Sequence, residues 1–487
     1  MPTFYIENFG CRATDADATT LRQAMIAGGM SVLEQPTAAD LVVLNTCTVT
    51  ASADSQAREA IRKIHRSNPS AIIVVTGCYA QRAPEELAAL EGVSLVVGNS
   101  HQTQIPRLVR EAFALYPHRH SACPDAGRER SEESLFAFAG RSATNFVPLT
   151  CLDDEPMSLA RGPAKILTGD IFAQTSLPVA PIENAGVLAD RTRPILKIQD
   201  GCNNRCSYCV IPFVRGRSRS LPPGAVIDEV KKLEAAGAKE IVLSGINLGS
   251  YGRDLTPREA LAPTAQRILK ETTLEQLRFS SIEPQDVTED FIAFVAASPR
   301  IARHFHVPLQ SGSDRILRAM HRWYRAAHYA QRIKLIRQTL PDAAIGADVI
   351  AGFPGETDDD FRATFEFIER LPFTYLHVFA FSARPGTKAA DLAEPLPTEI
   401  IRQRTHALRT LGQSKSAEFR SRLAGRIVRA LTLKRGGNTW TEAITGNYLQ
   451  VRIAGRLAAN QWCDARIDAD PAQIHAAPAA IEAASNP

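Results

Sequence analysis

The sequence has little net charge and no long apolar run. Its formal net charge is +4 over 487 residues, so bulk charge does not indicate a nucleic-acid partner, and any basic face must be local. No apolar stretch reaches the roughly 18 residues that suggest a membrane span. The N-terminal residues lack a charged segment followed by a long apolar one, so we expect no secretion signal. We therefore expect a cytoplasmic protein with no membrane partner.

Cysteine is also sparse, with nine residues in the chain. Without a secretion signal, these residues fit reduced thiols that act as ligands better than a disulfide scaffold. At about 150 residues per domain, the length predicts roughly three domains. We expect an N-terminal domain, a linker or insertion, a central domain, a small C-terminal domain and a frayed tail. Their boundaries are placed at 1–117, 118–192, 193–415, 416–470 and 471–487.

The densest cysteine motif is a C-x3-C-x2-C triplet formed by Cys202, Cys206 and Cys209. Each iron of a cubane iron–sulfur cluster takes an outer ligand, so three cysteines leave one iron open. An open coordination position can bind a substrate or cofactor. The alternative is a structural zinc site with a fourth ligand elsewhere in the chain.

A second set of three cysteines follows three strands of the N-terminal region. Strands are predicted at 3–9, 40–45 and 71–76, with helices between them, which favours a small parallel α/β sheet. The cysteines that come just after these strands are Cys11, Cys47 and Cys78. Because ligands bind along the carboxyl edge of such a sheet, the three thiols could form a second metal site. The alternative is three unrelated buried core residues.

Residues 118–192 mix Pro, Ala, Ser, Gly and both charges without sustained periodicity. This composition predicts a linker or insertion that is partly disordered. Cys123 and Cys151 lie in this segment, and we interpret both as incidental thiols.

Strands and helices alternate again from Pro194, which predicts an open or partial parallel (β/α)6 barrel. Strands are expected at 195–199, 240–244, 277–282, 305–309, 345–350 and 375–381. Helices are expected at 225–236, 288–297, 314–321, 326–340 and 357–369.

Polar and glycine residues repeatedly follow the apolar strands of this predicted barrel. Glycine lets a cofactor approach the backbone closely, and carboxylates could bind hydroxyls or an ammonium group. The alternative for the carboxylates is an ordinary role in strand-end turns. The candidate residues are Ser244, Gly245, Asn247, Glu283, Gln310 and Asp348.

A long helix at 399–424 is predicted to lead into short strands with glycine turns, which indicate a small β-barrel. Basic residues gather where this region begins: Lys415, Arg420, Arg422, Arg426, Arg429, Lys434 and Arg435. They predict nucleic-acid binding through phosphate contacts, with a solvated basic face as the alternative. Cys463 is interpreted as incidental.

These motifs together resemble one family. Gly201-Cys-Asn-Asn-Arg-Cys-Ser-Tyr-Cys209 resembles the radical-SAM cysteine motif, and the run that continues to Arg219 is similar to that of the methylthiotransferases. The three strand-end cysteines resemble the N-terminal domain of that family, and the C-terminal region resembles a TRAM domain, a small RNA-binding β-barrel. Segments 196–202, 241–252 and 280–284 are similar to the branch that acts on N6-threonylcarbamoyladenosine. Arg-Ala-Thr-Asp after Cys11 and the long middle insertion depart from that branch.

The resemblance implies two [4Fe–4S] clusters and S-adenosylmethionine. At Cys202, Cys206 and Cys209, the open iron would hold S-adenosylmethionine, and one electron from a flavodoxin-like or similar reductant would generate a 5′-deoxyadenosyl radical. At the N-terminal cysteines, the open iron would carry sulfur from a sulfur donor, and a second S-adenosylmethionine would supply the methyl group. The product would be a 2-methylthio group on adenosine 37 in the tRNA anticodon loop.

The resemblance also implies roles for other side chains. Tyr208 would pack against the adenine of S-adenosylmethionine, and the polar strand-end residues would contact the same cofactor. The arginines expected to hold RNA phosphates are Arg215, Arg217, Arg219 and Arg426, with solvated surface charges as the alternative.

Three competing functions stay open on the sequence. One is a sister methylthiotransferase that acts on N6-isopentenyladenosine or on a ribosomal protein aspartate. Another is a non-enzymatic iron–sulfur sensor that binds RNA. The third is a structural zinc protein.

Overall fold

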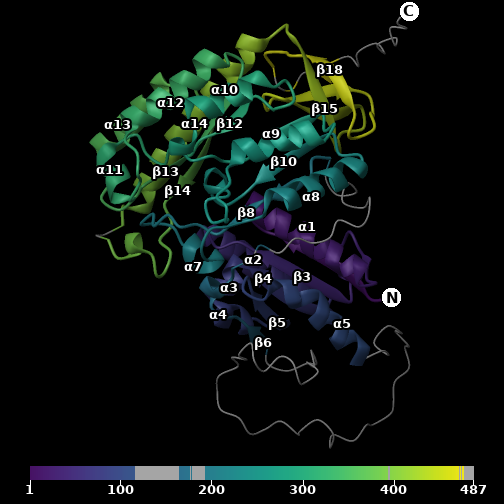
Figure 1. Ribbon diagram of the computed structural model, residues 1–487. Coiled ribbons are helices and arrows are strands. Elements are labelled where there is room, and N and C mark those ends of the chain that lie inside the picture. The colour runs from purple at the N-terminus through teal and green to yellow at the C-terminus, as the bar shows by residue number, and fades with distance from the viewer. Residues whose placement is uncertain are drawn as a thin grey trace, which may run out of the picture. The chain divides into compact units, whose positions relative to one another are not determined.

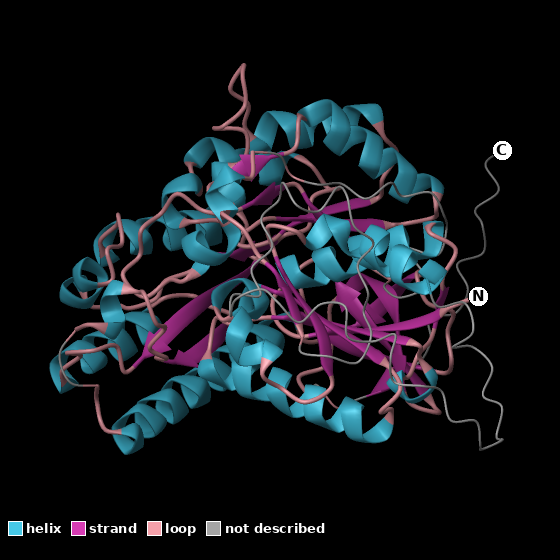
Figure 2. Cartoon of the chain, turned by 90° about the horizontal axis from the view of Figure 1, so that it is seen from below, coloured by secondary structure: helices cyan, strands magenta, loops and turns pink. Residues whose placement is uncertain are grey.

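The computed structural model describes residues 1–115, 164–175, 177, 192–392, 395–470, 472 and 474–475. The described chain divides into two compact units (Figure 1). The first consists of the described residues up to Gln174 together with Phe213–Arg215, and the second contains the other described residues. Figure 2 shows the same chain with its helices and strands distinguished by colour. Cys123 and Cys151 lie outside the described residues.

The first unit is built on a six-stranded parallel sheet with the order β2-β1-β3-β4-β5-β6. Its strands are β1 (Thr3–Asn8), β2 (Ser31–Val32), β3 (Leu41–Thr46), β4 (Ile72–Gly77), β5 (Val93–Gly98) and β6 (Lys165–Leu167). Its main helices are α1 (Arg12–Ala27), α2 (Ala51–Ser67), α3 (Cys78–Arg82), α4 (Pro84–Ala88) and α5 (Ile105–Leu115). The predicted parallel α/β sheet is confirmed.

Both faces of this sheet are buried, which explains the long apolar runs in its central strands β3, β4 and β5. Successive side chains on a strand point to opposite faces. Leu41 and Val43 therefore join one hydrophobic core with α1 and α5. Val42 and Leu44 join a second core with α2, α3 and α4. The result is a sheet between two layers of helices.

The strand β6 was not predicted, because residues 165–167 fall within the segment interpreted as a linker or insertion. Its Lys-Ile-Leu sequence is too short to show a period, yet it pairs in parallel with β5. Ile166 and Leu167 are both buried. The sheet of the first unit therefore extends beyond the expected boundary at residue 117, while residues 118–163 lie outside the described part.

The second unit contains six parallel strands in two sheets, β11-β10-β7 and β12-β13-β14. They are β7 (Ile195–Lys197), β10 (Glu240–Ser244), β11 (Gln276–Phe279), β12 (His304–His306), β13 (Ala344–Ala351) and β14 (Tyr375–Ala380). Parallel bridges from Leu277 to Ile301 and from Ser281 to His306 join the two sheets. The predicted partial (β/α)6 barrel is thus confirmed.

The helices of the barrel are α8 (Pro223–Ala235), α9 (Leu261–Glu271), α10 (Glu289–Ala297), α11 (Asp314–Ala319), α12 (Ala326–Thr339) and α13 (Asp358–Arg370). A short helix, α7 (Ile211–Arg215), and the hairpin of β8 (Gln199–Asp200) and β9 (Arg219–Ser220) flank the cysteine triplet. Sequence reasoning missed α9, which has an exposed proline, Pro263, in its first turn. Leu261, Ala265 and Ile268 of this helix are buried in the barrel core.

The helix α14 (Thr398–Leu423) leads into a curled, mainly antiparallel half-barrel with the order β18-β15-β16-β17-β19. Its strands are β15 (Ile427–Gly436), β16 (Trp440–Thr445), β17 (Gln450–Ala454), β18 (Trp462–Arg466) and β19 (Ile474–His475). Within the described residues, no helix is long and apolar enough to cross a membrane.

Candidate functional site

Three cysteines of the first unit lie at the carboxyl ends of three neighbouring strands. Cys11 precedes α1 directly after β1, Cys47 follows β3, and Cys78 begins α3 after β4. Since β1, β3 and β4 are adjacent in the sheet, their ends bring the three thiols to one edge. The thiols are close enough to perturb one another electrostatically. The parallel topology thus assembles ligands that are far apart in sequence.

The backbone at Gly10 approaches this triad closely. Gly10 has φ +127°, and a Cβ placed there would lie 2.5 Å from Cys47 Cβ and 3.0 Å from Cys47 Sγ. Only glycine fits such a backbone without moving the thiol. The residue before Cys11 is therefore constrained by the position of Cys47.

The charges around the triad favour a bound cation. Burial raises the pKa of the Cys47 thiol to about 12, and the neighbouring thiols Cys78 and Cys11 raise it further. Burial likewise raises the pKa of Cys78, against the opposing effect of Arg215. A thiolate is the ligand form of cysteine, so ligation here needs positive charge that one arginine does not supply. Three free, clustered thiols in this setting fit the irons of a cluster.

Arg215 is buried beside the first triad. Its side chain is 2% exposed. Its Nε donates to Cys78 Sγ at 3.3 Å, and its Nη2 forms an ion pair with Asp17 Oδ2 at 2.7 Å. Sequence reasoning placed Arg215 on a solvated basic segment because its neighbours are arginines, but the fold buries it beside a cysteine. These contacts place Arg215 beside Cys78, and its role as a phosphate contact stays a prediction.

The second triad lies on one loop of the second unit. Gly201, with φ +70°, begins this loop, and a Cβ there would lie 2.0 Å from the carbonyl oxygen of Arg217. The Cys202 amide donates to the carbonyl of Gly216, and the Cys209 amide donates to that of Cys206. These backbone hydrogen bonds fold the loop from Cys202 to Cys209 into a compact turn. The three cysteines are therefore brought together by local structure.

The second triad is also short of positive charge. Burial raises the pKa of Cys202 to about 11 and that of Cys209 to about 12, and nearby cysteines raise both further. Arg322 donates from Nη1 to Cys206 Sγ at 3.3 Å and forms an ion pair with Glu283. One arginine is shared between a carboxylate and three thiols, so it does not balance the negative charge of three thiolates. A bound cationic group would supply the missing positive charge.

Asn247 carries an unsatisfied polar atom beside the second triad. It is buried, and its Oδ1 has no hydrogen-bond partner in the described structure. Its side chain is close enough to affect the pKa of Cys202. Gln199 fixes the neighbouring backbone, because its Oε1 accepts from the Asn247 amide at 2.8 Å and its Nε2 donates to the carbonyl of Gly201. The orphaned oxygen is a ready acceptor for a bound ammonium group.

The other predicted cofactor contacts are placed as follows. Ser244 is buried at the end of β10. Beside it, a Cβ on Gly245 would lie 2.7 Å from Gln199 Oε1, so the glycine makes room for a protein side chain. Gln310 is buried with φ +68°, a rare conformation that often marks functional positions. Tyr208 packs against the apolar cluster of Ile316, Met320, Phe353 and Ala389.

Glu283 and Asp348 already have charged or titratable partners. Glu283 pairs with Arg322, although burial still raises the pKa of its carboxyl. Asp348 Oδ1 lies 3.1 Å from His306 Nε2 and 3.2 Å from His377 Nδ1. Burial opposes ionisation of Asp348, but these histidines hold its pKa below the ordinary value. Sequence reasoning missed Gln199, Arg322 and both histidines. Gln199 is the last residue of a predicted strand, and both histidines lie inside predicted strands, but none of these positions carries a motif.

The remaining predicted RNA contacts differ in exposure. Arg217 is exposed, Arg219 is buried near Asp200, and Arg426 is exposed but pairs with Asp342 at 2.6 Å.

In the half-barrel, arginine side chains lie over the rings of two tryptophans. The guanidinium of Arg429 lies 4.1 Å from the Trp462 ring centroid, and that of Arg452 lies 4.6 Å from the Trp440 ring centroid.

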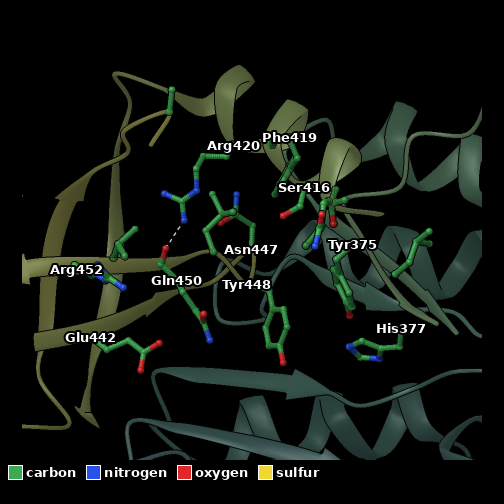
Figure 3. Close-up of a pocket in the computed structure, with 18 of the residues that line it drawn as sticks. Tyr375, His377, Ser416, Phe419, Arg420, Glu442, Asn447, Tyr448, Gln450 and Arg452 are labelled. Carbon is green, nitrogen blue, oxygen red and sulfur yellow. Dashed lines mark hydrogen bonds between the residues drawn. The ribbon is translucent and has the colours of Figure 1, made fainter. Parts of the chain in front are cut away.

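A pocket of about 620 Å³ lies between the half-barrel, α14 and β14 (Figure 3). Tyr375 and His377 of β14 lie near Tyr448 at one end of it, and Arg420 donates to the carbonyl of Gln450. The ring centroids of Tyr375 and Tyr448 are 5.6 Å apart. The pocket is lined by aromatic and basic side chains and by no cysteine ligand of either triad.

Comparison with known proteins identifies both units. Residues 3–98 match the model of the uncharacterized protein family UPF0004, and residues 196–368 match that of the radical SAM superfamily. The chain is 34% identical to a threonylcarbamoyladenosine tRNA methylthiotransferase of Aquifex aeolicus, over 92% of this chain and 96% of that protein. It is 31% identical to a tRNA-2-methylthio-N(6)-dimethylallyladenosine synthase of Thermobifida fusca, over 96% of this chain and 83% of that protein.

Among solved structures, the chain resembles the radical S-adenosylmethionine methyltransferase TsrM of Kitasatospora setae with cobalamin and a [4Fe-4S] cluster bound. The TM-score is 0.52 at 17% identity, covering 80% of this chain and 77% of that one, which supports the fold alone. Identity above 30% over nearly the whole length of curated relatives supports more than the fold. The chain belongs to the radical-SAM methylthiotransferase family.

Proposed function

We propose that this enzyme converts N6-threonylcarbamoyladenosine at position 37 of tRNA to its 2-methylthio derivative. The observation that carries the proposal is the 34% identity to the Aquifex aeolicus enzyme of that name, along nearly the full length of both chains. Similar identity to the enzyme of that name from Bacillus subtilis supports it. The radical-SAM family implies one [4Fe–4S] cluster and S-adenosylmethionine. The second cluster, at Cys11, Cys47 and Cys78, is part of the proposal.

The two triads have separate tasks in this proposal. Bound clusters would supply the electron for reductive cleavage of S-adenosylmethionine at Cys202, Cys206 and Cys209 and the iron that holds sulfur at Cys11, Cys47 and Cys78. One S-adenosylmethionine, bound near Cys202, Cys206 and Cys209, would supply the radical, and a second would supply the methyl group. The chain itself must bind these molecules, orient them and exclude water.

The orphaned Oδ1 of Asn247 is proposed to accept a hydrogen bond from the S-adenosylmethionine ammonium group. Ser244, Gly245, Glu283, Gln310 and Asp348 stay proposed contacts at the same strand ends. Glu283 acts there through its ion pair with Arg322, which fixes the position of the carboxylate. Tyr208 is proposed to cover the cofactor adenine, with its other face packed on the apolar cluster around Met320.

The tRNA is proposed to bind through Arg217, Arg219, Arg426 and the half-barrel. Arginine stacked on tryptophan suits single-stranded RNA, because bases stack on aromatic rings while arginine contacts phosphate. The target base must leave the anticodon-loop stack to be modified. A one-electron reductant, a sulfur donor and a cytoplasmic location belong to the same proposal.

The experiment is nucleoside analysis by mass spectrometry of tRNA from a strain that lacks this enzyme. We expect loss of 2-methylthio-N6-threonylcarbamoyladenosine and accumulation of its unmethylthiolated precursor. The wild-type chain should restore the product, and the Cys47→Ala variant is the matched control that should not. Unchanged nucleosides in the deletion strain would refute the proposal.

A sister activity is the second candidate, because the chain is also 31% identical to the dimethylallyladenosine enzyme of Thermobifida fusca. Assays of the purified enzyme on two matched anticodon stem-loops, one with each modified adenosine, separate the two substrates. Product on the dimethylallyl stem-loop alone would favour the sister activity.

A further inference from the structure

The barrel carries a His–Asp–His cluster whose two histidines have no part in the proposed chemistry. His306 ends β12, Asp348 lies in β13 and His377 lies in β14, on three neighbouring parallel strands. Asp348 and His377 are direct cross-strand partners, and His306 pairs with Gly346, two residues before Asp348. Because side chains on a strand repeat every second residue, this register puts all three on one face.

The separations within the cluster match those of ligands around one ion. Asp348 Oδ1 lies 3.1 Å from His306 Nε2 and 3.2 Å from His377 Nδ1, and all three ligand atoms lie within 4.8 Å of one another. Bonds from zinc to nitrogen and oxygen of about 2.0–2.1 Å put tetrahedral ligands roughly 3.3 Å apart. The two short separations thus leave space for a zinc-sized ion with little rearrangement.

The His306 ring is buried and fixed from its far side. The Nδ1 atom of His306 lies 2.5 Å from Ser281 Oγ, and the His306 side chain is 5% exposed. Its Nε2 makes no hydrogen bond of acceptable geometry, although it faces Asp348. If Nδ1–H donates to Ser281, Nε2 presents a lone pair toward the carboxylate. A metal-bound histidine is held in the same way, with its other nitrogen hydrogen-bonded.

One side of the cluster is accessible to solvent. The His377 side chain is 47% exposed, and His377 also lines the 620 Å³ pocket at the half-barrel (Figure 3). The ring of Tyr375, which lines the same pocket, stacks on His306 with centroids 5.9 Å apart. An ion could therefore enter from the pocket and find three ligands in place.

We propose that His306, Asp348 and His377 bind a divalent transition-metal ion, with zinc as the best fit. Two imidazoles and one carboxylate suit zinc and related ions, and three protein ligands leave a coordination position for water or an oxygen ligand. The site uses none of the six cysteines of the two triads, so its ion is additional to any iron–sulfur cluster. It does not rest on the proposed tRNA substrate.

The test uses the full chain, reconstituted anaerobically with iron and sulfide so that the cysteine triads are occupied. The protein is equilibrated with zinc sulfate, passed through a desalting column and analysed for zinc. We expect about one zinc per chain, and an anomalous difference peak between His306, Asp348 and His377 in crystals measured above, but not below, the zinc absorption edge.

Substitutions make the test specific. His377→Gln and Asp348→Asn should each lower zinc affinity by at least about 100-fold, and Ser281→Ala by about 10-fold through the orientation of His306. His406→Gln, which changes an exposed histidine of α14, should leave affinity unchanged. Because His377 is half exposed, the His377→Gln variant should fold. Its zinc affinity tests the proposal even if the Asp348→Asn variant does not fold.

Three outcomes would overturn the proposal. They are no retained zinc, equal retention by the wild type and His377→Gln, and an anomalous peak at the cysteines instead. Each would leave the cluster as a structural contact between two imidazole rings and a carboxylate. Since no tRNA or S-adenosylmethionine is present, the result does not depend on whether the proposed substrate is right.

Discussion

The two cysteine triads reach similar electrostatic settings by different routes. Cys11, Cys47 and Cys78 come from three separate strand ends, so only the folded sheet brings them together. The triad of Cys202, Cys206 and Cys209 lies on a single loop, held by a few backbone hydrogen bonds. The first triad should therefore depend on the fold of its unit, whereas the second should depend on its local turn. The following substitutions separate these two cases.

The largest effect is expected from Cys206→Ala. Reductive cleavage of S-adenosylmethionine should fall to background, and iron should fall from about eight to about four atoms per chain, because only the loop triad loses its cluster. The measurements are 5′-deoxyadenosine formation with dithionite and iron analysis after anaerobic reconstitution. Cleavage at the wild-type rate would contradict the assignment of this triad.

Cys47→Ala should give the complementary result. Iron should again fall to about four atoms per chain, but cleavage of S-adenosylmethionine should continue, because the loop triad is intact. The methylthiolated nucleoside should be absent from the reaction with substrate tRNA, as measured by mass spectrometry. If this variant still forms the product, the N-terminal triad does not carry sulfur.

Gly10→Ala tests the dependence of the first triad on its sheet. A Cβ at φ +127° that lies 2.5 Å from Cys47 Cβ must displace the backbone or the thiol, at a cost of about 1–3 kcal/mol. We expect partial or complete loss of the first cluster with the second retained, as judged by iron content and electron paramagnetic resonance. Gly29→Ala is the matched control, since Gly29 has φ +85° but nothing within 4 Å of its added Cβ.

Arg322→Gln should have a smaller effect, confined to the second triad. The variant removes a cationic hydrogen-bond donor to Cys206 Sγ, which stabilises the reduced, more negative state of a bound cluster. The cluster reduction potential should become more negative, as measured by a redox titration. Arg318→Gln, an exposed neighbour on α11, should leave the potential unchanged. An unchanged potential in the Arg322 variant would show that this contact does not tune the cluster.

The smallest effect is expected from Arg217→Gln, near the loop triad. If exposed Arg217 contacts phosphate, tRNA affinity should weaken modestly, and the slope of log affinity against log salt should fall by about 1. The measurement is tRNA binding over a range of salt concentrations. Arg370→Gln, exposed on α13, is the control. An equal salt slope in the Arg217 variant would remove Arg217 from the interface.

Sequence patterns could predict the elements that carry the ligands, because apolar strands followed by glycine and cysteine are visible without a structure. The strand at Glu240–Ser244 and the alternation of strands and helices along the barrel were predictable for the same reason. Side chains that act through tertiary contacts were not. Arg322 reaches Cys206 across 116 positions of the chain, and Arg215 is buried although its neighbours in sequence suggest a solvated face.

The second limit concerns short elements and a helix that contains proline. The three residues of β6 show no periodicity, and Pro263 lies in the first turn of α9. The His–Asp–His cluster escaped notice because its ligands come from three strands at positions that no sequence spacing connects. Only the register of β12, β13 and β14 reveals that they meet.

The helix α14 limits how the C-terminal half-barrel can be studied by truncation. Arg404, near its N-terminal end, is buried against Glu356 of the barrel, whereas Phe419 and Leu423 lie in the core of the half-barrel. Removing residues after 424 would expose those apolar side chains on a helix that remains attached to the catalytic barrel. Such a shortened protein would aggregate for reasons unrelated to RNA, so the contribution of the half-barrel to substrate recognition has to be measured with point substitutions on its outer surface.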